Sequence, residues 1–243
     1  MAELRAVIVV DYQNIHLTGH GLFASKVPKH ESLVDPLLYA NELIRARNRA
    51  QTPGHEHAVL TRVEVYRGLP SAEHDPDSYA RNLAQKAHWE RDARVRVTHR
   101  PLKYEYVRDS EGSPAHGPDG KRIAVGKKEK GVDVLCALAL VREAANPDVD
   151  LVVLASHDSD LEPALDEALL LRSAKVETVN WYDPSQRYRC PQLRPEDRTR
   201  RLWNTRLMET EFHRCVDRTN YDLHALGVGP DIADPEIMRA ARR

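Results

Sequence analysis

Two short, nearly continuous aliphatic runs constrain the fold of this 243-residue chain more than any other feature. Residues 6–10 read AVIVV and residues 150–156 read DLVVLAS, and acidic residues follow each run. Such runs, rich in β-branched residues, are typical of strands that are buried on both faces. Strands of this kind belong to parallel sheets covered by helices, so the two runs predict the centre of an α/β domain.

The remaining patterns alternate between strand and helix. Strands are predicted at 62–68, 94–100 and 175–181, and helices at 35–51, 78–93, 132–146 and 161–173. The helix at 132–146 is apolar nearly all round, so we expect it to be buried. The Gly-, Pro- and charge-rich stretch 108–131 predicts a loop or a small hairpin. Together these elements predict an open, mostly parallel α/β sandwich.

The texture of the chain changes after Asp183, where arginines become frequent. We therefore expect one domain over residues 1–183 and an Arg-rich, mainly helical C-terminal extension over residues 184–243.

Composition narrows the classes of protein that fit. The formal net charge is -1, so overall charge does not indicate a nucleic-acid binder. The three cysteines are scattered without a CxxC pair, which argues against disulfides or a cysteine zinc site and fits a reducing compartment. The sequence has neither a signal-peptide pattern nor a run of roughly 20 apolar residues. We expect a cytoplasmic protein that does not contact membranes.

Four aspartates are expected to converge at one edge of the sheet. Asp11 follows the first strand, Asp158 and Asp160 follow the strand at 150–156, and Asp133 lies in the first turn of the helix at 132–146. In open parallel sheets this edge is where ligands bind. Two carboxylates roughly 4 Å apart repel by about 4 kcal/mol at an effective dielectric near 20. A hard divalent cation, Mg²⁺ or Mn²⁺, would offset that cost.

A structural role is the alternative for part of this set. Asp11 alone fits a helix cap, and Ser159 with Glu162 has the spacing of a capping box before the helix at 161–173. Asp133 is harder to explain in this way, because an acid on a helix suited to the core is costly without a partner.

Three ordered motifs carry a resemblance to a known family. They are D-x-x-N at Asp11 and Asn14, K-G-V-D at 130–133, and S-x-D-S-D-x-x-P at 156–163. Over roughly residues 4–182 the chain resembles the NYN domain of the PIN-like nucleases, in the LabA-like branch. The resemblance implies a PIN-like three-layer α/β/α sandwich. The chain differs from the family pattern at His157, where Gly is usual, and at Leu161, where an aromatic residue is common.

The resemblance also implies an activity, that of a Mg²⁺- or Mn²⁺-dependent endoribonuclease. Its metal-binding and catalytic acids map onto Asp11, Asp133, Asp158 and Asp160. Asn14 would orient a water or a phosphate oxygen, and Ser156 and Ser159 would support the acids from behind.

An acidic pocket repels phosphate, so an RNA partner, single-stranded or structured, requires basic and aromatic residues around the pocket. The candidates for RNA contact are Arg67, Lys127, Lys128, Lys130, Arg187, Arg189, Arg201 and Trp203. Charged stretches more often form solvated surfaces, so a purely structural role is the alternative to RNA contact for these residues. Whether the chain forms a homo-oligomer stays open.

Other nucleases and phosphatases that use an Asp after the first strand fit this sequence less well. A haloacid-dehalogenase-type phosphatase requires a second Asp two positions after the first, and Gln13 stands there. A flap-type DNA nuclease usually carries more acids and a helical arch. A DNA-cleaving relative and a non-catalytic RNA-binding or regulatory NYN module remain as alternatives, although none of the four acids is missing.

Overall fold

The computed structural model describes residues 3–52, 54–171, 173–197, 199–200 and 202–221. The chain divides into two compact units. Unit 1 comprises the residues up to Gly68 together with Trp89–Arg100 and Lys130–Arg218, and unit 2 comprises Leu69–His88, Pro101–Glu129 and the residues after Arg218. The sequence suggested a boundary at residue 183, but the two units do not divide there.

Unit 1 is built on a six-stranded sheet with the strand order β3-β2-β1-β6-β7-β8. The strands are β1 (Leu4–Asp11), β2 (Ala58–Leu69), β3 (Val95–Pro101), β6 (Leu151–Ala155), β7 (Lys175–Trp181) and β8 (Asn204–Leu207). β1 runs parallel to both of its neighbours, and the β6–β7 and β7–β8 pairs are parallel as well. The aliphatic runs at 6–10 and 150–156 thus form the two adjacent central strands, β1 and β6.

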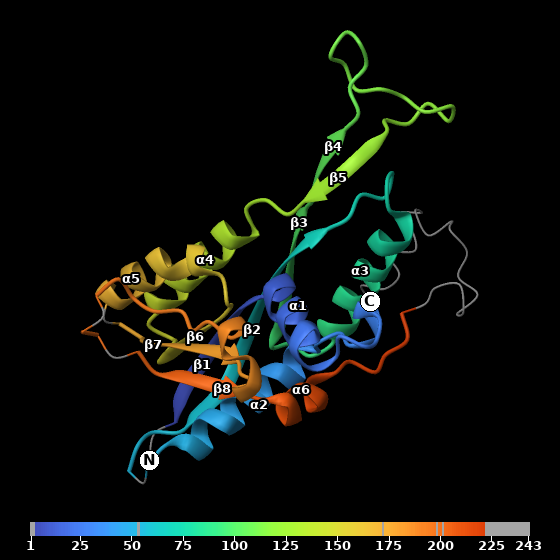
Figure 1. Ribbon diagram of the computed structural model, residues 1–243. Helices are drawn as coiled ribbons and strands as arrows, with labels where there is room; N and C mark the ends of the chain where they lie inside the picture. The colour runs from blue at the N-terminus through green and yellow to red at the C-terminus, as the bar shows by residue number, and fades with distance from the viewer. Residues whose placement is uncertain (1–2, 53, 172, 198, 201, 222–243) are drawn as a thin grey trace. The chain divides into compact units, whose positions relative to one another are not determined.

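Helices cover both faces of this sheet (Figure 1). They are α1 (Tyr12–Phe23), α2 (Pro36–Ala50), α4 (Val132–Ala144), α5 (Glu162–Leu171) and α6 (Glu209–Cys215), with short 3₁₀ turns η1 (Lys29–Glu31), η2 (Ser159–Leu161) and η3 (Pro184–Arg189). Alternate residues of β1 point to opposite sides: Ile8 packs in the core beneath α1, α2 and α6, and Val9 packs beneath α4 and α5. The predicted three-layer α/β/α sandwich is confirmed.

Helix α1 was not predicted from the sequence. Its segment YQNIHLTGHGLF contains two glycines, which weaken helical propensity. Tertiary packing accounts for the difference, because Gly19 lies where a Cβ atom would come within 2.9 Å of both Trp181 and Phe212. Asp11 begins the helix, since its side chain accepts a hydrogen bond from the Asn14 backbone N–H at 3.4 Å.

The C-terminal part of unit 1 also differs from the prediction of a mainly helical extension. β8 joins the sheet in parallel beside β7, and α6 packs on α2. β8 and α6 therefore complete the sandwich. Residues 222–243 of the expected extension lie outside the described residues.

Helix α4 begins as the sequence predicted but is not buried all round. Val134 is 55% exposed and Leu138 is 60% exposed, whereas Cys136 and Leu140 are fully buried. Only one face packs against the sheet and α5, so the expectation of a buried helix was wrong.

Unit 2 contains helix α3 (Pro76–Trp89, its last residue in unit 1) and an antiparallel hairpin of β4 (Lys103–Tyr106) and β5 (Ala124–Lys128). The hairpin continues beyond the two strands through isolated bridges between Arg108 and Pro114 and between His116 and Arg122 (Figure 1). Of the two alternatives for the stretch at 108–131, the hairpin is the one that forms.

Candidate functional site: an acidic edge on the central sheet

The site lies where β1 and β6 end, at the carboxyl edge of the sheet. Asp11 is the last residue of β1, and Val10 of that strand pairs with Ala155, the last residue of β6. The chain leaves β6 as Ser156 and His157 and reaches Asp158 at the start of η2. The parallel register thus places Asp11 beside the loop that carries the acids of the third motif.

One hydroxyl group links two of the predicted acids. Ser156 Oγ donates a hydrogen bond to Asp11 Oδ2 at 2.9 Å and accepts one from the Asp158 backbone N–H at 3.0 Å. Ser156 is 1% exposed and Asp11 is 7% exposed. The structure thus places the Ser156 hydroxyl between the Asp11 carboxylate and the backbone of Asp158.

Asp158 and Asp160 lie closer to solvent. Asp158 is partly buried and begins η2, where its Oδ1 accepts a hydrogen bond from the Asp160 backbone N–H at 3.0 Å. Asp160 and Ser159 are exposed. One oxygen of Asp158 therefore caps η2, which leaves the second oxygen of that carboxylate for a ligand.

Asp133 lies in the first turn of α4, a helix that packs on β1, β6 and η2. The helix begins after Gly131, whose φ of 79° is in the left-handed region that favours glycine. Asp133 is partly buried. Among the described residues, no three of the four predicted acids have carboxylate oxygens within 4.8 Å of one another. The structure therefore links Asp11 directly to the loop that carries Asp158. Asp133 is near them only in that its helix, α4, packs on β1, β6 and η2.

Asn14 is committed to holding the loop. Its Oδ1 accepts a hydrogen bond from the His157 backbone N–H at 2.7 Å. The side-chain amide thus ties the first turn of α1 to the chain between Ser156 and Asp158. Its Nδ2 group forms no hydrogen bond with any described residue, which leaves two donors for a water or a phosphate oxygen.

His157 is the residue that sequence reasoning undervalued. Its ring is buried, Nδ1 lies 3.2 Å from the Pro191 carbonyl oxygen, and Nε2 accepts a hydrogen bond from the Trp181 backbone N–H at 3.2 Å. Burial lowers the pKa of His157 to about 4, although the contact with Pro191 acts in the opposite direction. The only signal in the sequence was the departure from the glycine that is usual in the NYN pattern.

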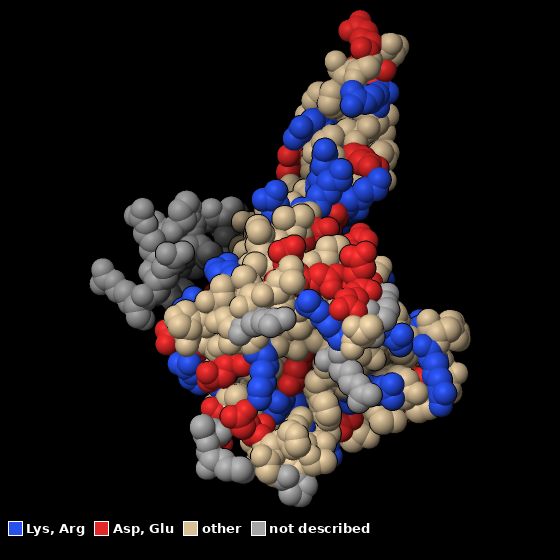
Figure 2. Space-filling view, turned by 90° about the vertical axis from the view of Figure 1, so that its left-hand side faces the viewer, with Lys and Arg blue, Asp and Glu red and all other residues tan. Residues whose placement is uncertain are grey.

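The lysines predicted to contact RNA belong to different units. Lys127 and Lys128 lie on β5 in unit 2, where Lys127 pairs with Asp75 and Lys128 pairs with Glu105 at 2.7 Å. Figure 2 shows basic and acidic side chains alternating along the hairpin. Lys130 lies in unit 1 and is exposed. Two of the three predicted lysines are therefore already paired with acids.

The arginines and Trp203 are distributed unevenly. Arg187 and Arg189 in η3 are exposed, Trp203 is 41% exposed, and Arg201 lies outside the described residues. Arg67 is 7% exposed, and its guanidinium lies 4.5 Å from the centroid of the Tyr12 ring and 5.4 Å from that of Trp89. A rim position was expected for Arg67, but the structure buries it among aromatic rings.

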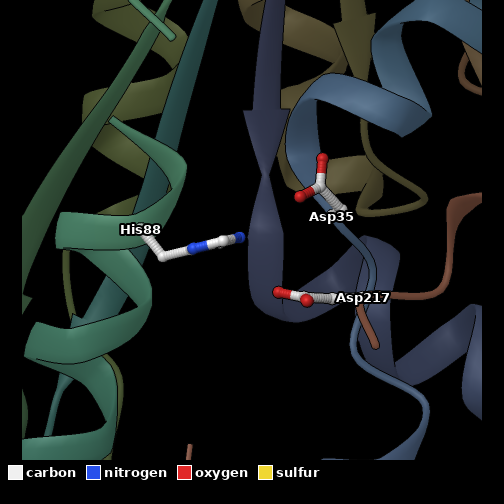
Figure 3. Close-up of side chains that lie close together, drawn as sticks. All are labelled: Asp35, His88 and Asp217. Atoms are coloured by element: carbon white, nitrogen blue, oxygen red, sulfur yellow. The ribbon is translucent and has the colours of Figure 1, made fainter. Parts of the chain in front are cut away.

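A second pair of aspartates in unit 1 was not predicted to be a site. Asp35 and Asp217 have carboxylate oxygens within 4.8 Å of each other (Figure 3). Asp35 begins α2, as the sequence indicated, by accepting a hydrogen bond from the Leu38 backbone N–H at 2.8 Å. Asp217 accepts one from Trp89 Nε1 at 2.8 Å. The first contact caps α2, and the second ties the chain after α6 to the buried Trp89.

Comparison with known proteins adds little to this geometry. No protein-family profile and no curated protein match the chain. A crystal structure of a protein of unknown function, VPA0982 from Vibrio parahaemolyticus RIMD 2210633, is similar over 73% of this chain and 81% of its own. The two share 20% sequence identity with a TM-score of 0.39.

Proposed function

We propose that the chain is a metal-dependent ribonuclease that hydrolyses phosphodiester bonds at the acidic edge of its sheet. The observation that carries the proposal is the Ser156 bridge between Asp11 and the Asp158 loop, because it holds acids from two adjacent strands together at the edge where such sheets bind ligands. This is the chemistry that the resemblance to NYN nucleases implies.

The donor set fits a hard divalent cation. Among the described residues, Asp133, Asp158 and Asp160 form no ion pair with a lysine or arginine. Carboxylate oxygens are the ligands that Mg²⁺ and Mn²⁺ prefer, and Mg²⁺ usually keeps several waters. Oxygens bound to one Mg²⁺ lie at most about 4 Å apart, so some of these acids would act through water. When bound, the ion lowers the pKa of a water and offsets charge that develops on the phosphate.

The chain's own residues have separate roles in this scheme. Asp11 and Asp158 would hold the ion, with Asp133 and Asp160 contributing directly or through water. Ser156 fixes the relative orientation of the first two. Asn14 uses Oδ1 to hold the loop and would present Nδ2 to the attacking water or to a phosphate oxygen. In-line attack by water would leave a 5′-phosphate and a 3′-hydroxyl.

RNA is the proposed substrate, in a cytoplasmic setting. The exposed Arg187, Arg189 and Lys130 would contact phosphate, and Trp203 would stack on an unpaired base. Lys127 and Lys128 would contribute only by exchanging their acidic partners for phosphate.

The test is cleavage of labelled RNA and of DNA of the same sequence, with Mn²⁺ or with a chelator. Asp158→Asn should abolish Mn²⁺-dependent RNA cleavage while leaving the fold intact. Asp148→Asn, at an exposed aspartate paired with Arg5, is the matched control and should cleave normally. Full activity of Asp158→Asn would contradict the proposal. Cleavage of DNA alone, or RNA binding without cleavage, would favour the DNA nuclease or the non-catalytic module instead.

A further inference from the structure

His157 occupies a junction of four separate pieces of unit 1. Its backbone N–H donates to Asn14 in α1, and its ring contacts the Trp181 backbone in β7 and the Pro191 carbonyl oxygen. It also stands between Ser156 and Asp158 in the chain. A residue with 8% exposure therefore fixes the segment 156–161, which we call the acidic loop, through contacts on three sides.

The ring replaces a missing strand partner. β6 pairs with β7 only as far as Ala155 and Val179, after which the chain turns away from the sheet. The Trp181 N–H would then lack a carbonyl partner on that side, and His157 Nε2 accepts its hydrogen bond instead. A buried N–H group without a partner is destabilising, so this contact holds the loop against the end of β7.

Both ring nitrogens have defined roles. The Pro191 carbonyl can only accept, so Nδ1 carries the proton and donates to it, while Nε2 uses its lone pair for the Trp181 N–H. The ring is thus held as one neutral tautomer in one orientation. The other neutral tautomer would lose both hydrogen bonds, because its Nε2–H would face the Trp181 N–H and its Nδ1 lone pair would face the Pro191 carbonyl oxygen.

Pro191 belongs to a segment, residues 190–196, that we call the strap. The strap is tied to the elements around the acids: the Cys190 carbonyl oxygen accepts from Asn180 Nδ2 at 3.1 Å, and the Arg194 N–H donates to Glu162 at 2.9 Å. The Glu196 N–H donates to Asp166 of α5 at 3.0 Å. His157 joins this strap to the acidic loop itself through the Pro191 carbonyl oxygen.

We propose that His157 is a positioning residue, whose neutral imidazole clamps the acidic loop between β7 and the strap and so holds Asp158 in its metal-binding orientation. The inference rests on the proposed function for its catalytic meaning. The clamping of the loop is a separate physical claim that can be tested without cleavage. Residues that orient metal ligands typically change metal affinity or activity 10–100-fold when removed.

Three variants separate the contacts. His157→Ala removes both ring contacts. His157→Asn places an amide near the position of Nδ1 and keeps a donor for Pro191, whereas His157→Gln places a carbonyl oxygen near the position of Nε2 and keeps an acceptor for Trp181. The matched control is His20→Ala. His20, in α1, is also a buried histidine, 9% exposed, and its Nδ1 is hydrogen-bonded to Ser32 Oγ at 2.8 Å.

The measurements are the Mn²⁺ dissociation constant by calorimetry, RNA cleavage, amide hydrogen exchange and thermal unfolding. We expect His157→Ala to weaken Mn²⁺ binding about 10-fold or more and to accelerate amide exchange in residues 156–161. His157→Gln and His157→Asn should each restore part of the Mn²⁺ affinity and part of the exchange protection. His20→Ala should lower the unfolding temperature without changing Mn²⁺ affinity.

The outcomes separate this inference from the proposed function. If wild-type protein binds no Mn²⁺ and cleaves no RNA, the proposed function fails, and faster exchange at 156–161 in His157→Ala would still support the clamp. If His157→Ala only lowers the unfolding temperature, with Mn²⁺ affinity, cleavage and exchange at 156–161 unchanged, His157 is a core residue and the positioning role is overturned.

Discussion

Ser156 Oγ lies 2.9 Å from Asp11 Oδ2, and through this bond the end of β1 is joined to the loop that follows β6. The same oxygen receives the Asp158 N–H, so one buried hydroxyl group orders both acids. Hydrogen bonds to charged groups are worth more than those between neutral groups, about 1.5–3 kcal/mol. The bridge therefore has consequences for both stability and metal binding.

Replacing this serine should damage activity more than its stability cost explains. Ser156→Ala should lower the free energy of unfolding by about 1–3 kcal/mol, because it removes a partner from Asp11 and another from the Asp158 N–H. Cleavage should fall 10–100-fold through misorientation of the acids. Denaturant unfolding and Mn²⁺-dependent RNA cleavage measure the two effects.

Ser32→Ala is the control for this prediction. Ser32 is also a buried serine with two hydrogen bonds, to His20 and to the Lys29 carbonyl oxygen. It should show a comparable loss of stability with normal cleavage. If both variants lose activity equally, Ser156 acts only through stability.

The acids could be predicted because their position depends on local sequence. Asp11 directly follows one aliphatic run and Asp158 comes shortly after the other, and parallel strands place their ends at one edge. The same reasoning located Asp133 at a helix start but gave no distance between the side chains. That distance depends on how α4 packs against the sheet, which no spacing in the sequence encodes.

The clamp at His157 could not be predicted from the sequence. Its partners Trp181 and Pro191 are 24 and 34 positions away, and both contribute backbone atoms that carry no residue-specific signal. The prediction that α4 is buried all round was wrong for a related reason. Val134 and Leu138 are as apolar as Leu140, so only the packed structure distinguishes the covered face from the open one.

A buried ion pair between α2 and β7 should dominate the response to charge changes in unit 1. The shortest of the Arg47–Glu177 hydrogen bonds are Nη2 to Oε1 at 2.9 Å and Nε to Oε2 at 3.0 Å, and both side chains are less than a tenth exposed. Glu177→Gln should lower the free energy of unfolding by about 3–5 kcal/mol, because it leaves the buried guanidinium uncompensated.

The double variant Arg47→Met with Glu177→Leu tests that explanation. It removes both charges while keeping apolar volume, so it should recover most of the stability that Glu177→Gln loses. Urea denaturation of the two variants and the wild type gives the comparison. A double variant as unstable as Glu177→Gln would show that lost packing, rather than buried charge, is responsible.

Acidification should destabilise the protein through His16. Burial, assisted by the charge of Arg67, lowers the pKa of His16 to about 4, below its ordinary value of 6.5. The unfolded state therefore binds a proton more readily, so this contribution to stability is complete above pH 6.5 and is lost as the pH falls toward 4. At pH 5 the loss is about 2 kcal/mol.

His16→Phe provides the comparison, since a phenyl ring can keep the stacking of His16 on Tyr12. The decrease in unfolding free energy between pH 7 and pH 5 should be smaller in this variant by about 2 kcal/mol. His157 is unchanged in both proteins, so the difference isolates His16. An identical pH dependence would show that His16 does not remain neutral in the folded state.

The hairpin of unit 2 offers a test in which removing an acid improves binding. Lys127 pairs with Asp75, and the pKa of Asp75 is lowered because hydrogen bonds from Lys127 and Ser78 outweigh the opposing effect of burial. If Lys127 contacts phosphate, it must first give up this partner. Asp75→Asn should therefore strengthen RNA binding, and Lys127→Ala should weaken it only slightly.

Salt dependence makes the hairpin prediction specific. Each phosphate contact to a single strand contributes about 0.7 to the slope of log K against log salt concentration. The slope should therefore become steeper by up to that amount in Asp75→Asn, and Lys127→Ala should abolish the gain when the two changes are combined. Fluorescence anisotropy at several salt concentrations measures the slopes. An unchanged slope in Asp75→Asn would mean that this face of the hairpin does not contact RNA, because freeing a lysine at an RNA interface must release counterions.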